Sequence, residues 1–336
     1  MPNRPLPIRT MPTRHFCTLF DRNYLLKGAV MLRSIGQHCP GAQIHVLCMD
    51  AVTQELLHKL AIPGVHTIAR VDVESEEVLA AKKTRSIAEY CWTLSSVLLW
   101  HVMQRRADIE LLTYLDADLM FFSDVAPIFD AMGAASILAI EHRYTPRLAN
   151  LEPYGRFNVQ WVSFRRDRDG MACLQTWREQ CLEWCFALIE EGRHGDQKYL
   201  DAWPARYGDA FHNLRHVGAG LAPWNYPNYR IEARGDAIWV DDVPLIFYHF
   251  HQFQILEGGG FDCFSTNYAE DTPAPDLVYQ RYWHAVQASI ASVRQFEPGF
   301  SAGFRAASTV TLRRMASRLL PLKVKSALKR IGLRPW

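Results

Sequence analysis

The sequence has no hydrophobic run that approaches the roughly 20 residues of a membrane-spanning helix. Its first 14 residues hold prolines and arginines but no apolar core segment, so we expect no secretory signal there. It also lacks a Gly-rich loop ending in Gly-Lys-Ser/Thr, and no serine stands in a Gly-x-Ser-x-Gly context. These absences argue against a P-loop nucleotide hydrolase and against a serine hydrolase with a nucleophile elbow.

A paired cysteine–histidine pattern is missing as well. The eight cysteines are scattered through mostly apolar segments, and only Cys181 and Cys185 are close together, four residues apart on a predicted helix. No histidine or cysteine pair nearby completes a zinc site. We therefore interpret the cysteines as buried free thiols of a protein in a reducing cytoplasm.

Composition and charge suggest one large domain with two extensions. Apolar residues make up 49% of the 336 residues, which is enough for a sizeable core. The net charge is +2, but residues 301–336 carry nine cations and no carboxylate, so the rest of the chain carries −7. We predict a flexible N-terminus (1–14), a catalytic domain (15–297) and a basic tail (298–336). No nucleic-acid-binding module is recognisable, so we expect no nucleic-acid partner.

Strand and helix patterns alternate along the chain, which is typical of an open, mostly parallel α/β sheet flanked by helices. Ser86 and Glu89 form a capping box at the start of a long predicted helix. The predicted strands are 15–20, 44–49, 65–71, 110–115, 136–140, 157–164 and 244–249, and the predicted helices are 25–35, 53–61, 87–102 and 171–190.

The segment Tyr114–Phe122 holds two carboxylates, Asp116 and Asp118, in an apolar run. Burying two unpaired carboxylates is costly, so such a pair needs a cation or an exit into solvent at the end of the strand. Ligands of open α/β sheets bind at the carboxyl ends of strands, and Mg²⁺ and Mn²⁺ prefer oxygen ligands. The pair therefore suggests a metal–diphosphate site, although two aspartates that cap a turn would give the same pattern.

Two later clusters offer further polar groups. Tyr248–His251 ends an apolar strand, and one of its two imidazoles, His249 or His251, would complete a three-ligand metal site with the aspartates. An exposed histidine pair without a role is the alternative. Between two helical segments, Asp196 and Gln197 are placed either to cap a helix or to bind sugar hydroxyls.

Two more segments are less specific. Asn158 and Gln160 alternate with apolar residues, so both face one side of a strand, which is either solvent or a polar cleft. The cations of Lys82–Arg85 precede a helix, where a positive charge opposes the helix dipole. A bound anion explains them, and so does a plain solvated loop.

Taken together and in this order, several segments resemble the GT-A nucleotide-sugar glycosyltransferases. They are most similar to bacterial nucleotide-diphospho-sugar transferases related to glycosyltransferase family 8, and the resemblance runs from about His15 to Phe253. The segments that carry it are 89–93, 114–119, 163–167, 195–201, 218–225 and 248–251.

The resemblance implies a role for each matching residue. Asp116 and Asp118 would hold Mn²⁺ or Mg²⁺ and the donor diphosphate, and His249 would be the third metal ligand. Gln252 replaces a glycine that the family has beyond this histidine, so the local backbone is expected to differ. The implied donor contacts, for which a UDP-sugar is expected, are Thr18 and Tyr24 at the base and ribose, and Asn158 at the sugar. Arg85 is a further candidate for substrate binding, on the anion interpretation of the Lys82–Arg85 cations rather than on the resemblance. Gln160, where the family has glycine, would reshape the sugar pocket, and Asp196 and Gln197 would lie beside the reacting carbon, as in retaining members.

The tail shows an amphipathic helical pattern with cations beside an apolar stripe, from Thr309 to Leu320 and again from Val324 to Ile331. Basic amphipathic helices bind the headgroup region of anionic membranes. Packing of this segment on the acidic body is the alternative. We expect a cytoplasmic enzyme held at the inner face of the cytoplasmic membrane.

The function predicted from the sequence is therefore metal-dependent, retaining transfer of a sugar from a nucleotide-sugar to a hydroxyl, such as that of a glycan or lipid-linked glycan of the bacterial envelope. A sugar-phosphate nucleotidyltransferase is one alternative, but Asp21–Tyr24 stands where such enzymes carry a Gly-rich phosphate loop. A non-catalytic sugar-binding module of the same fold is the other.

Overall fold

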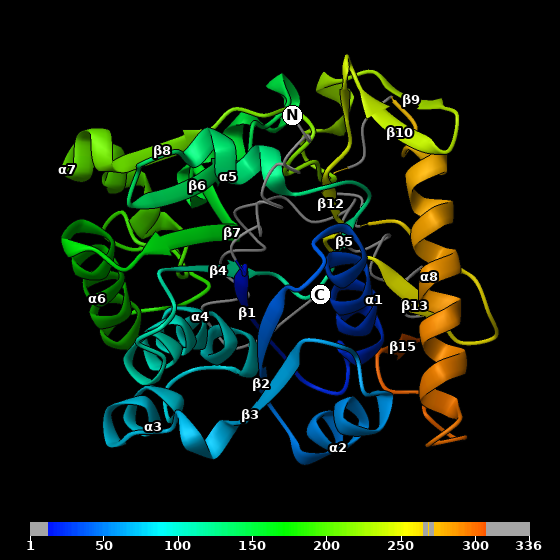
Figure 1. Ribbon diagram of the computed structural model, residues 1–336, viewed down its shortest axis with the longest axis horizontal. Coiled ribbons are helices and arrows are strands. Elements are labelled where there is room, and N and C mark those ends of the chain that lie inside the picture. The colour runs from blue at the N-terminus through cyan, green and yellow to red at the C-terminus, as the bar shows by residue number, and fades with distance from the viewer. Residues whose placement is uncertain (1–12, 265–267, 269–271, 307–336) are drawn as a thin grey trace, which may run out of the picture.

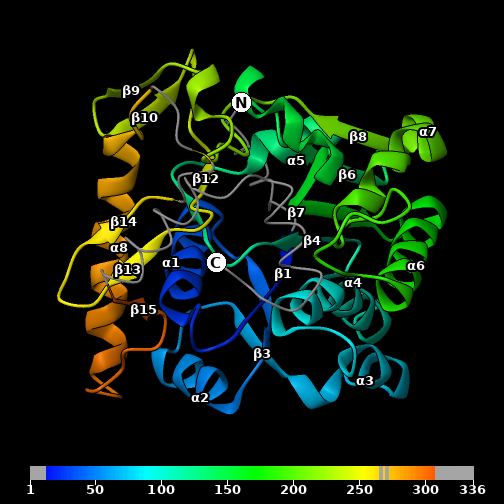
Figure 2. The ribbon, with the colours of Figure 1, turned by 180° about the vertical axis from the view of Figure 1, so that it is seen from behind.

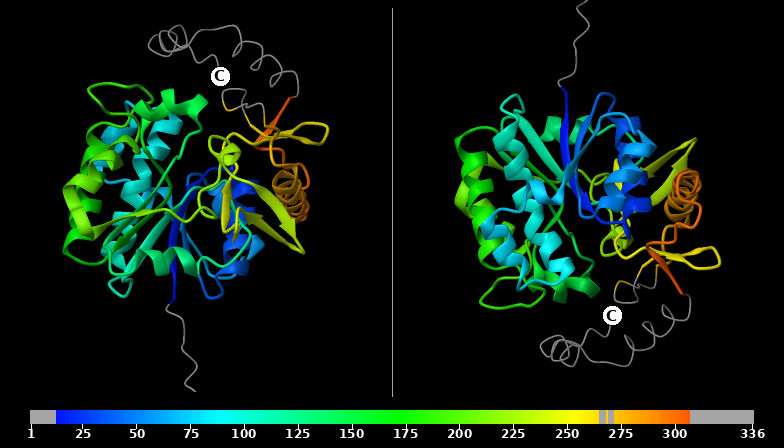
Figure 3. Two further views of the ribbon diagram at one scale, coloured as in Figure 1. Left: turned by 90° about the horizontal axis from the view of Figure 1, so that it is seen from above. Right: turned by 90° about the horizontal axis from the view of Figure 1, so that it is seen from below.

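The computed structural model describes residues 13–264, 268 and 272–306, which place a central sheet between two layers of helices (Figures 1 and 3). The central sheet has seven strands in the order β3-β2-β1-β4-β7-β6-β8. Its strands are β1 His15–Phe20, β2 Gln43–Cys48, β3 Val65–Ala69, β4 Leu111–Leu115, β6 Ile137–Glu141, β7 Phe157–Arg165 and β8 Phe211–Leu214.

This sheet is mostly parallel, as the alternation of strands and helices predicts. The strands β3, β2, β1 and β4 run parallel to one another, and β8 runs parallel to β6. Only β7 is reversed, because it pairs antiparallel with both β4 and β6. The α/β fold predicted from the sequence is thus confirmed.

Helices cover both faces of the sheet, which explains why apolar residues of the strands are buried on both sides. One hydrophobic core joins the sheet to α1 Leu25–His38, α2 Ala51–Leu60, α5 Ala126–Met132 and α8 Asp276–Arg294. The other joins it to α3 Glu76–Lys82, α4 Ile87–Arg105, α6 Arg168–Glu183 and α7 Trp203–Tyr207. Short 3₁₀ turns connect these elements: η1 Arg70–Asp72, η2 Pro146–Tyr154, η3 Lys198–Ala202, η4 Gly208–Ala210 and η5 Tyr226–Asn228. The helix α8, which no sequence pattern above predicts, packs beside α1 (Figures 1 and 2).

The helix α4 begins as its capping box predicts, since Ser86 and Glu89 exchange hydrogen bonds between side chain and backbone. The prediction for α6 is wrong at its end, because the helix stops at Glu183 rather than at Glu190. Trp184 is extended, and Arg85 donates hydrogen bonds to the carbonyl oxygens of Leu182 and Glu183. A tertiary contact thus satisfies carbonyl groups that the helix end leaves unpaired, and Cys185 falls outside the helix.

Three small sheets flank the central one. The strands β5 Leu119–Phe121 and β12 Phe247–His249 pair antiparallel, with His249 opposite Leu119. The other two small sheets contain β9 Ile231–Arg234, β10 Ala237–Val240 and β11 Val243–Pro244, and β13 Gln254–Leu256, β14 Phe261–Asp262 and β15 Phe304–Arg305. The single strand predicted over 244–249 is thus divided. Leu245 bonds back to Ile238, whereas the next residue bonds to Gly218, so the chain changes partners between β11 and β12.

The start of the predicted basic tail lies within the described structure. Phe300 is buried, and Phe304–Arg305 pairs parallel with β13. Gly303 approaches the backbone of Asn23 so closely that a Cβ atom would clash with the Asn23 carbonyl oxygen. The tail helices predicted over 309–331 lie outside the described residues. Among the helices that the structure describes, none is both long and apolar enough to cross a membrane.

Candidate functional site

The two aspartates of the 114–122 segment follow β4 at its carboxyl end, where the parallel strands of this sheet present ligands. The Asp116 backbone N–H donates to the carbonyl oxygen of Gln160 in β7 (3.2 Å), and the Asp118 carbonyl oxygen accepts from the N–H of Phe250 (2.9 Å). The pair is therefore fixed between the central sheet and the β5–β12 ribbon. Asp118 is buried, whereas the Asp116 side chain is 29% exposed.

The β5–β12 pairing brings two histidines to these carboxylates. His249 Nε2 lies 3.0 Å from Asp118 Oδ1 and 3.7 Å from Asp116 Oδ2. Ligand atoms of Asp118, His249 and His251 all lie within 4.8 Å of one another. Both histidines therefore lie close to Asp118. The sequence left open which of the two would bind a metal, and in the structure both are placed to do so. Carboxylate oxygens with imidazole nitrogens form a donor set that fits Mn²⁺ and, with fewer imidazoles, Mg²⁺.

The pKa values of the two carboxylates are shifted in opposite directions. Burial raises the pKa of Asp116 to about 6, and the charge of Asp118 adds to this effect while His249 opposes it. Burial also acts to raise the pKa of Asp118, but its charge interaction and hydrogen bond with His249 prevail, helped by Lys27 and His251, and they hold that pKa below its usual value. Asp118 is therefore an anion at neutral pH, ready to bind a cation.

Asp196 approaches the same region from the loop after α6. Its carboxylate accepts a hydrogen bond from the Ser95 hydroxyl of α4 (2.9 Å), and its carbonyl oxygen accepts one from Trp177 Nε1 (2.9 Å). Burial raises the pKa of Asp196 to about 7, and the negative charge of Asp116 contributes. Gln197, not Asp196, occupies the N-cap position of η3. The capping alternative for Asp196 therefore does not account for its carboxylate.

The polar residues of β7 also face inward rather than toward solvent. Asn158 donates to His142 Nε2 (2.9 Å) and accepts from the Gln160 backbone N–H (2.8 Å). Both polar atoms of the Gln160 amide are buried without a hydrogen-bond partner among the described residues. Such unpaired groups are costly unless a ligand satisfies them. Gln197 is directed elsewhere, because its amide donates to the carbonyl oxygen of Tyr154 (2.9 Å).

The remaining predicted contacts are placed differently. Thr18 lies fully buried in β1 with its hydroxyl unpaired among the described residues. Tyr24 precedes α1 and is 41% exposed, and its pKa is raised by burial and by the charges of Asp118 and Asp116. The Arg85 guanidinium contacts the end of α6 and lies 3.8 Å from the Phe186 ring centroid. These contacts account for its charge without an anion, and its predicted phosphate contact stays a prediction.

Two residues near the site are not among those predicted from the sequence. Trp224 lies edge-on to His142, His249 and His251, at ring-centroid distances of 5.1–5.5 Å. Its segment carries part of the family resemblance, but no local pattern indicates what it contacts. Lys27 is 5% exposed in α1, and its charge interacts with Asp118. Its only signal in the sequence is a cation among the apolar residues at the start of α1.

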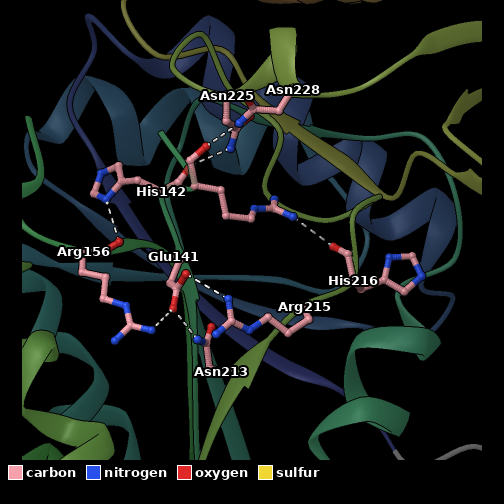
Figure 4. A network of polar contacts seen from close by, with 9 residues as sticks. Glu141, His142, Arg156, Asn213, Arg215, His216, Asn225 and Asn228 are labelled. Atoms are coloured by element: carbon pink, nitrogen blue, oxygen red, sulfur yellow. Dashed lines mark hydrogen bonds and ion pairs between the residues drawn. The ribbon is translucent and has the colours of Figure 1, made fainter. Parts of the chain in front are cut away.

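A polar network holds the end of β6 beside the site (Figure 4). Glu141 accepts hydrogen bonds from Arg156, Asn213 and Arg215. The Asn225 amide donates to the carbonyl oxygens of His142 (2.8 Å) and Gly220 (3.0 Å). These contacts fix the loop that carries Trp224. Beyond the histidines, Gln252 has a φ of 62°, in the left-handed region that favours glycine.

Comparison with known proteins gives two close sequence relatives. No family model matches the chain. The uncharacterized protein YfnD of Bacillus subtilis (strain 168) is 33% identical over 297 residues, which are 88% of this chain and 95% of YfnD. The uncharacterized protein YfnF of the same organism is 30% identical over 299 residues, 86% of this chain and 97% of YfnF.

Solved structures with a similar fold include two of LgtC. An active-site mutant of LgtC superposes with a TM-score of 0.53, and the galactosyltransferase LgtC in complex with donor and acceptor sugar analogs superposes with 0.50. Each match is 14% identical and covers 82% of this chain and 95% of LgtC. At this identity the likeness concerns the fold alone, and it confirms the GT-A architecture predicted from the sequence.

Proposed function

The chain belongs to the same family as the uncharacterized Bacillus subtilis proteins YfnD and YfnF, and we propose that it is a metal-dependent glycosyltransferase that uses a nucleotide-sugar donor. The observation that carries this proposal is the cluster of Asp116, Asp118, His249 and His251 beyond the carboxyl end of β4, with Asp196 near enough for its charge to interact with that of Asp116. The GT-A fold supports it.

In the proposed reaction, the bond between the anomeric carbon and a diphosphate oxygen breaks, and the oxygen keeps the electron pair. The acceptor hydroxyl forms the new bond to carbon, and its proton passes to the released diphosphate. A divalent cation, Mn²⁺ or Mg²⁺, bound by the aspartates and histidines would stabilise the negative charge that develops on the diphosphate. The carboxylate of Asp196 suits the positive charge that develops on the sugar ring.

We assign binding of the donor sugar to Asn158 and Gln160 of β7. Asn158 is held by neutral His142, whose pKa burial lowers to about 3, and its amide is oriented by that contact. The unpaired amide of Gln160 offers a donor and an acceptor for sugar hydroxyls. Retention of configuration is part of the proposal and rests on the resemblance of Asp196-Gln197. The Gln197 amide contacts Tyr154, so it would have to turn to reach the reacting carbon.

A panel of nucleotide-sugars tests this function. With Mn²⁺ present, we expect slow hydrolysis of one donor and faster transfer when a glycan acceptor is added, both seen by mass spectrometry. UDP-sugars are the first to try, and the anomeric proton signal of the product reports retention. Release of pyrophosphate from a nucleoside triphosphate and a sugar phosphate would instead identify a nucleotidyltransferase. Binding of a donor without turnover, with every acceptor tried, would favour a non-catalytic module.

We also propose that the basic tail holds the enzyme on the cytoplasmic face of an anionic membrane, where a lipid-linked glycan of the envelope would be the acceptor. Eight of the nine cations of residues 301–336 lie beyond Ala306. Each cation near such a surface contributes about 1 kcal/mol. A truncation that tests this proposal should begin after Ala306, because residues 301–306 include β15 and the close contact of Gly303 with Asn23.

Deletion of residues 307–336 is therefore expected to abolish binding to anionic liposomes while leaving donor hydrolysis in solution unchanged. Co-sedimentation with phosphatidylglycerol vesicles measures the first effect, and neutral phosphatidylcholine vesicles are the control. A variant in which the eight cations beyond Ala306 are replaced by glutamine separates charge from length. Undiminished sedimentation of the truncated chain would contradict the membrane proposal.

A further inference from the structure

Lys27 is a buried cation for which the described protein offers no hydrogen-bonding partner. It lies in α1, 5% exposed, and its ammonium donates no hydrogen bond and forms no ion pair with a described residue. It contacts the face of the Tyr24 ring, 4.5 Å from the centroid. Burying a lysine is costly without an anion nearby. The charge of Asp118 acts on Lys27, but the ammonium forms no hydrogen bond with that carboxylate, so its donors remain available for a further anion.

The packing of α1 directs this cation toward the candidate metal site. The Ser34 hydroxyl accepts a hydrogen bond from the Phe121 N–H of β5, which fixes one face of α1 against the strand that follows Asp118. Lys27 precedes Ser34 by seven residues, two helical turns, and so lies on the same face. The charges of Lys27 and Asp118 act on each other, which is consistent with this placement.

A second unpaired polar group approaches from α8. Tyr282 is fully buried, and its hydroxyl has no hydrogen-bond partner among the described residues. Its ring stacks on Phe250, between His249 and His251 in the chain, with a centroid distance of 3.6 Å. The Ser289 hydroxyl donates to the Leu26 carbonyl oxygen (2.9 Å) and holds α8 against α1 beside Lys27. The helices α1 and α8 pack together, and the charge of Asp118 acts on both the Lys27 ammonium and the Tyr282 hydroxyl.

We propose that Lys27 and Tyr282 bind the sugar-linked phosphate of the donor, and that Lys27 stabilises the diphosphate oxygen that receives the electron pair when the sugar leaves. This inference rests on the proposed function, because it assigns protein groups to the leaving diphosphate. Asp116, Asp118 and the histidines supply ligands for a cation, whereas Lys27 supplies a fixed positive charge of the chain itself. The ring of Tyr24 lies against Lys27, and the family resemblance implies that Tyr24 contacts the base or ribose of the donor.

The test is the binding of nucleoside diphosphates and monophosphates by isothermal titration calorimetry. Lys27→Met removes the charge and keeps the side-chain length. We expect it to weaken the nucleoside diphosphate that the wild type binds best, among UDP, GDP, CDP and ADP, by about 10- to 100-fold. The matching monophosphate, which lacks the second phosphate, should change by less than about threefold. The difference should persist when Mn²⁺ is replaced by EDTA, because Lys27 acts without the metal.

Tyr282→Phe should weaken the same diphosphate by about 3- to 10-fold, since it removes one neutral donor. The matched controls are Lys59→Met, whose exposed lysine pairs with Glu55, and Tyr279→Phe, which loses a buried hydroxyl contact with Tyr248 on the same helix as Tyr282. Neither should change diphosphate affinity. Without ligand, Tyr282→Phe should melt no lower than the wild type, because it removes an unpaired buried hydroxyl. Both Lys27→Met and Tyr282→Phe should show a smaller rise in Tm with diphosphate.

The outcomes separate this inference from the proposed function. A wild type that binds no nucleoside diphosphate, with or without Mn²⁺, contradicts both. Wild-type binding together with unchanged affinity in Lys27→Met contradicts the phosphate site alone. Equal losses for diphosphate and monophosphate would also overturn it, because they would show a general effect on the nucleotide site.

Discussion

Replacing Asp118 by asparagine is expected to lower sugar transfer about 10³-fold, measured as kcat with saturating donor and Mn²⁺. Asparagine keeps the shape of the side chain but removes the anionic metal ligand that lies 3.0 Å from His249. A bound metal contributes several kcal/mol of charge stabilisation, and each 1.36 kcal/mol corresponds to a factor of ten. Asp118→Ala should have an equal or larger effect. The control is Asp130→Asn, an exposed carboxylate of α5.

The Asp118→Asn substitution should also destabilise the metal-free protein. Because the folded state holds the pKa of Asp118 below its ordinary value of 3.8, ionised Asp118 stabilises the fold above about pH 4, and this contribution is lost as the pH falls below it. Asparagine cannot make this contribution at any pH, and it leaves Lys27 and His249 without the negative charge of Asp118. We expect the free energy of unfolding to fall by about 1.5–3 kcal/mol at pH 7. Urea unfolding measures this loss, and the rise in Tm on adding Mn²⁺ should disappear. Turnover within tenfold of wild type, or an unchanged response to Mn²⁺, would rule out Asp118 as a metal ligand.

Replacing Asp196 by asparagine should affect stability in the opposite direction while also reducing turnover. Burial and Asp116 raise the pKa of Asp196 from 3.8 to about 7, so the fold favours its protonated form. The stability from this preference is fully present below about pH 4 and is lost as the pH rises through about 7. Above that pH the ionised, buried carboxylate destabilises the wild type by at most about 4 kcal/mol. Asparagine is neutral at every pH and retains an oxygen for the Ser95 hydroxyl.

We therefore expect Asp196→Asn to be more stable than the wild type at pH 8, with a difference that shrinks toward pH 4, as measured by urea unfolding across this range. Turnover should fall about 10²–10³-fold, because the neutral amide no longer opposes the positive charge on the sugar. Asp209→Asn, at an exposed position, is the control for removal of a carboxylate. A stability difference that does not depend on pH would show that burial of Asp196 does not set its ionisation. Full activity would remove it from the proposed mechanism.

The carboxylates of the candidate site show how much of it can be predicted from the sequence. Asp116 and Asp118 stand out because charge in an apolar strand is costly wherever that strand lies, and the family resemblance adds His249 and Asp196. The pairing of His249 with Asp118 spans 131 residues, and that of Ser95 with Asp196 spans 101. No local pattern indicates the contribution of Ser95, and the sequence offers His251 only as an alternative to His249, not together with it.

Arg85 shows the opposite case. Its position before a helix leaves two interpretations open when only local charge is considered, a bound anion and a solvated loop. In the fold it donates to the carbonyl groups at the end of α6, nearly one hundred residues away. The same contact explains why the helix predicted to reach Glu190 ends at Glu183. A local pattern cannot report a hydrogen bond whose partner depends on how distant helices pack.

The amino-acid pattern alone was sufficient for the alternation of strands and helices, the capping of α4 and the carboxylate pair at the end of β4. Each of these depends on interactions within a few residues: hydrophobic periodicity, side-chain caps and the cost of buried charge. The approach of His251, the opposite pKa shifts of Asp116 and Asp118, and the unpaired groups of Lys27 and Tyr282 required the folded chain. They depend on burial and on contacts between α1, α8 and the β5–β12 ribbon, and these exist only once distant segments are packed together.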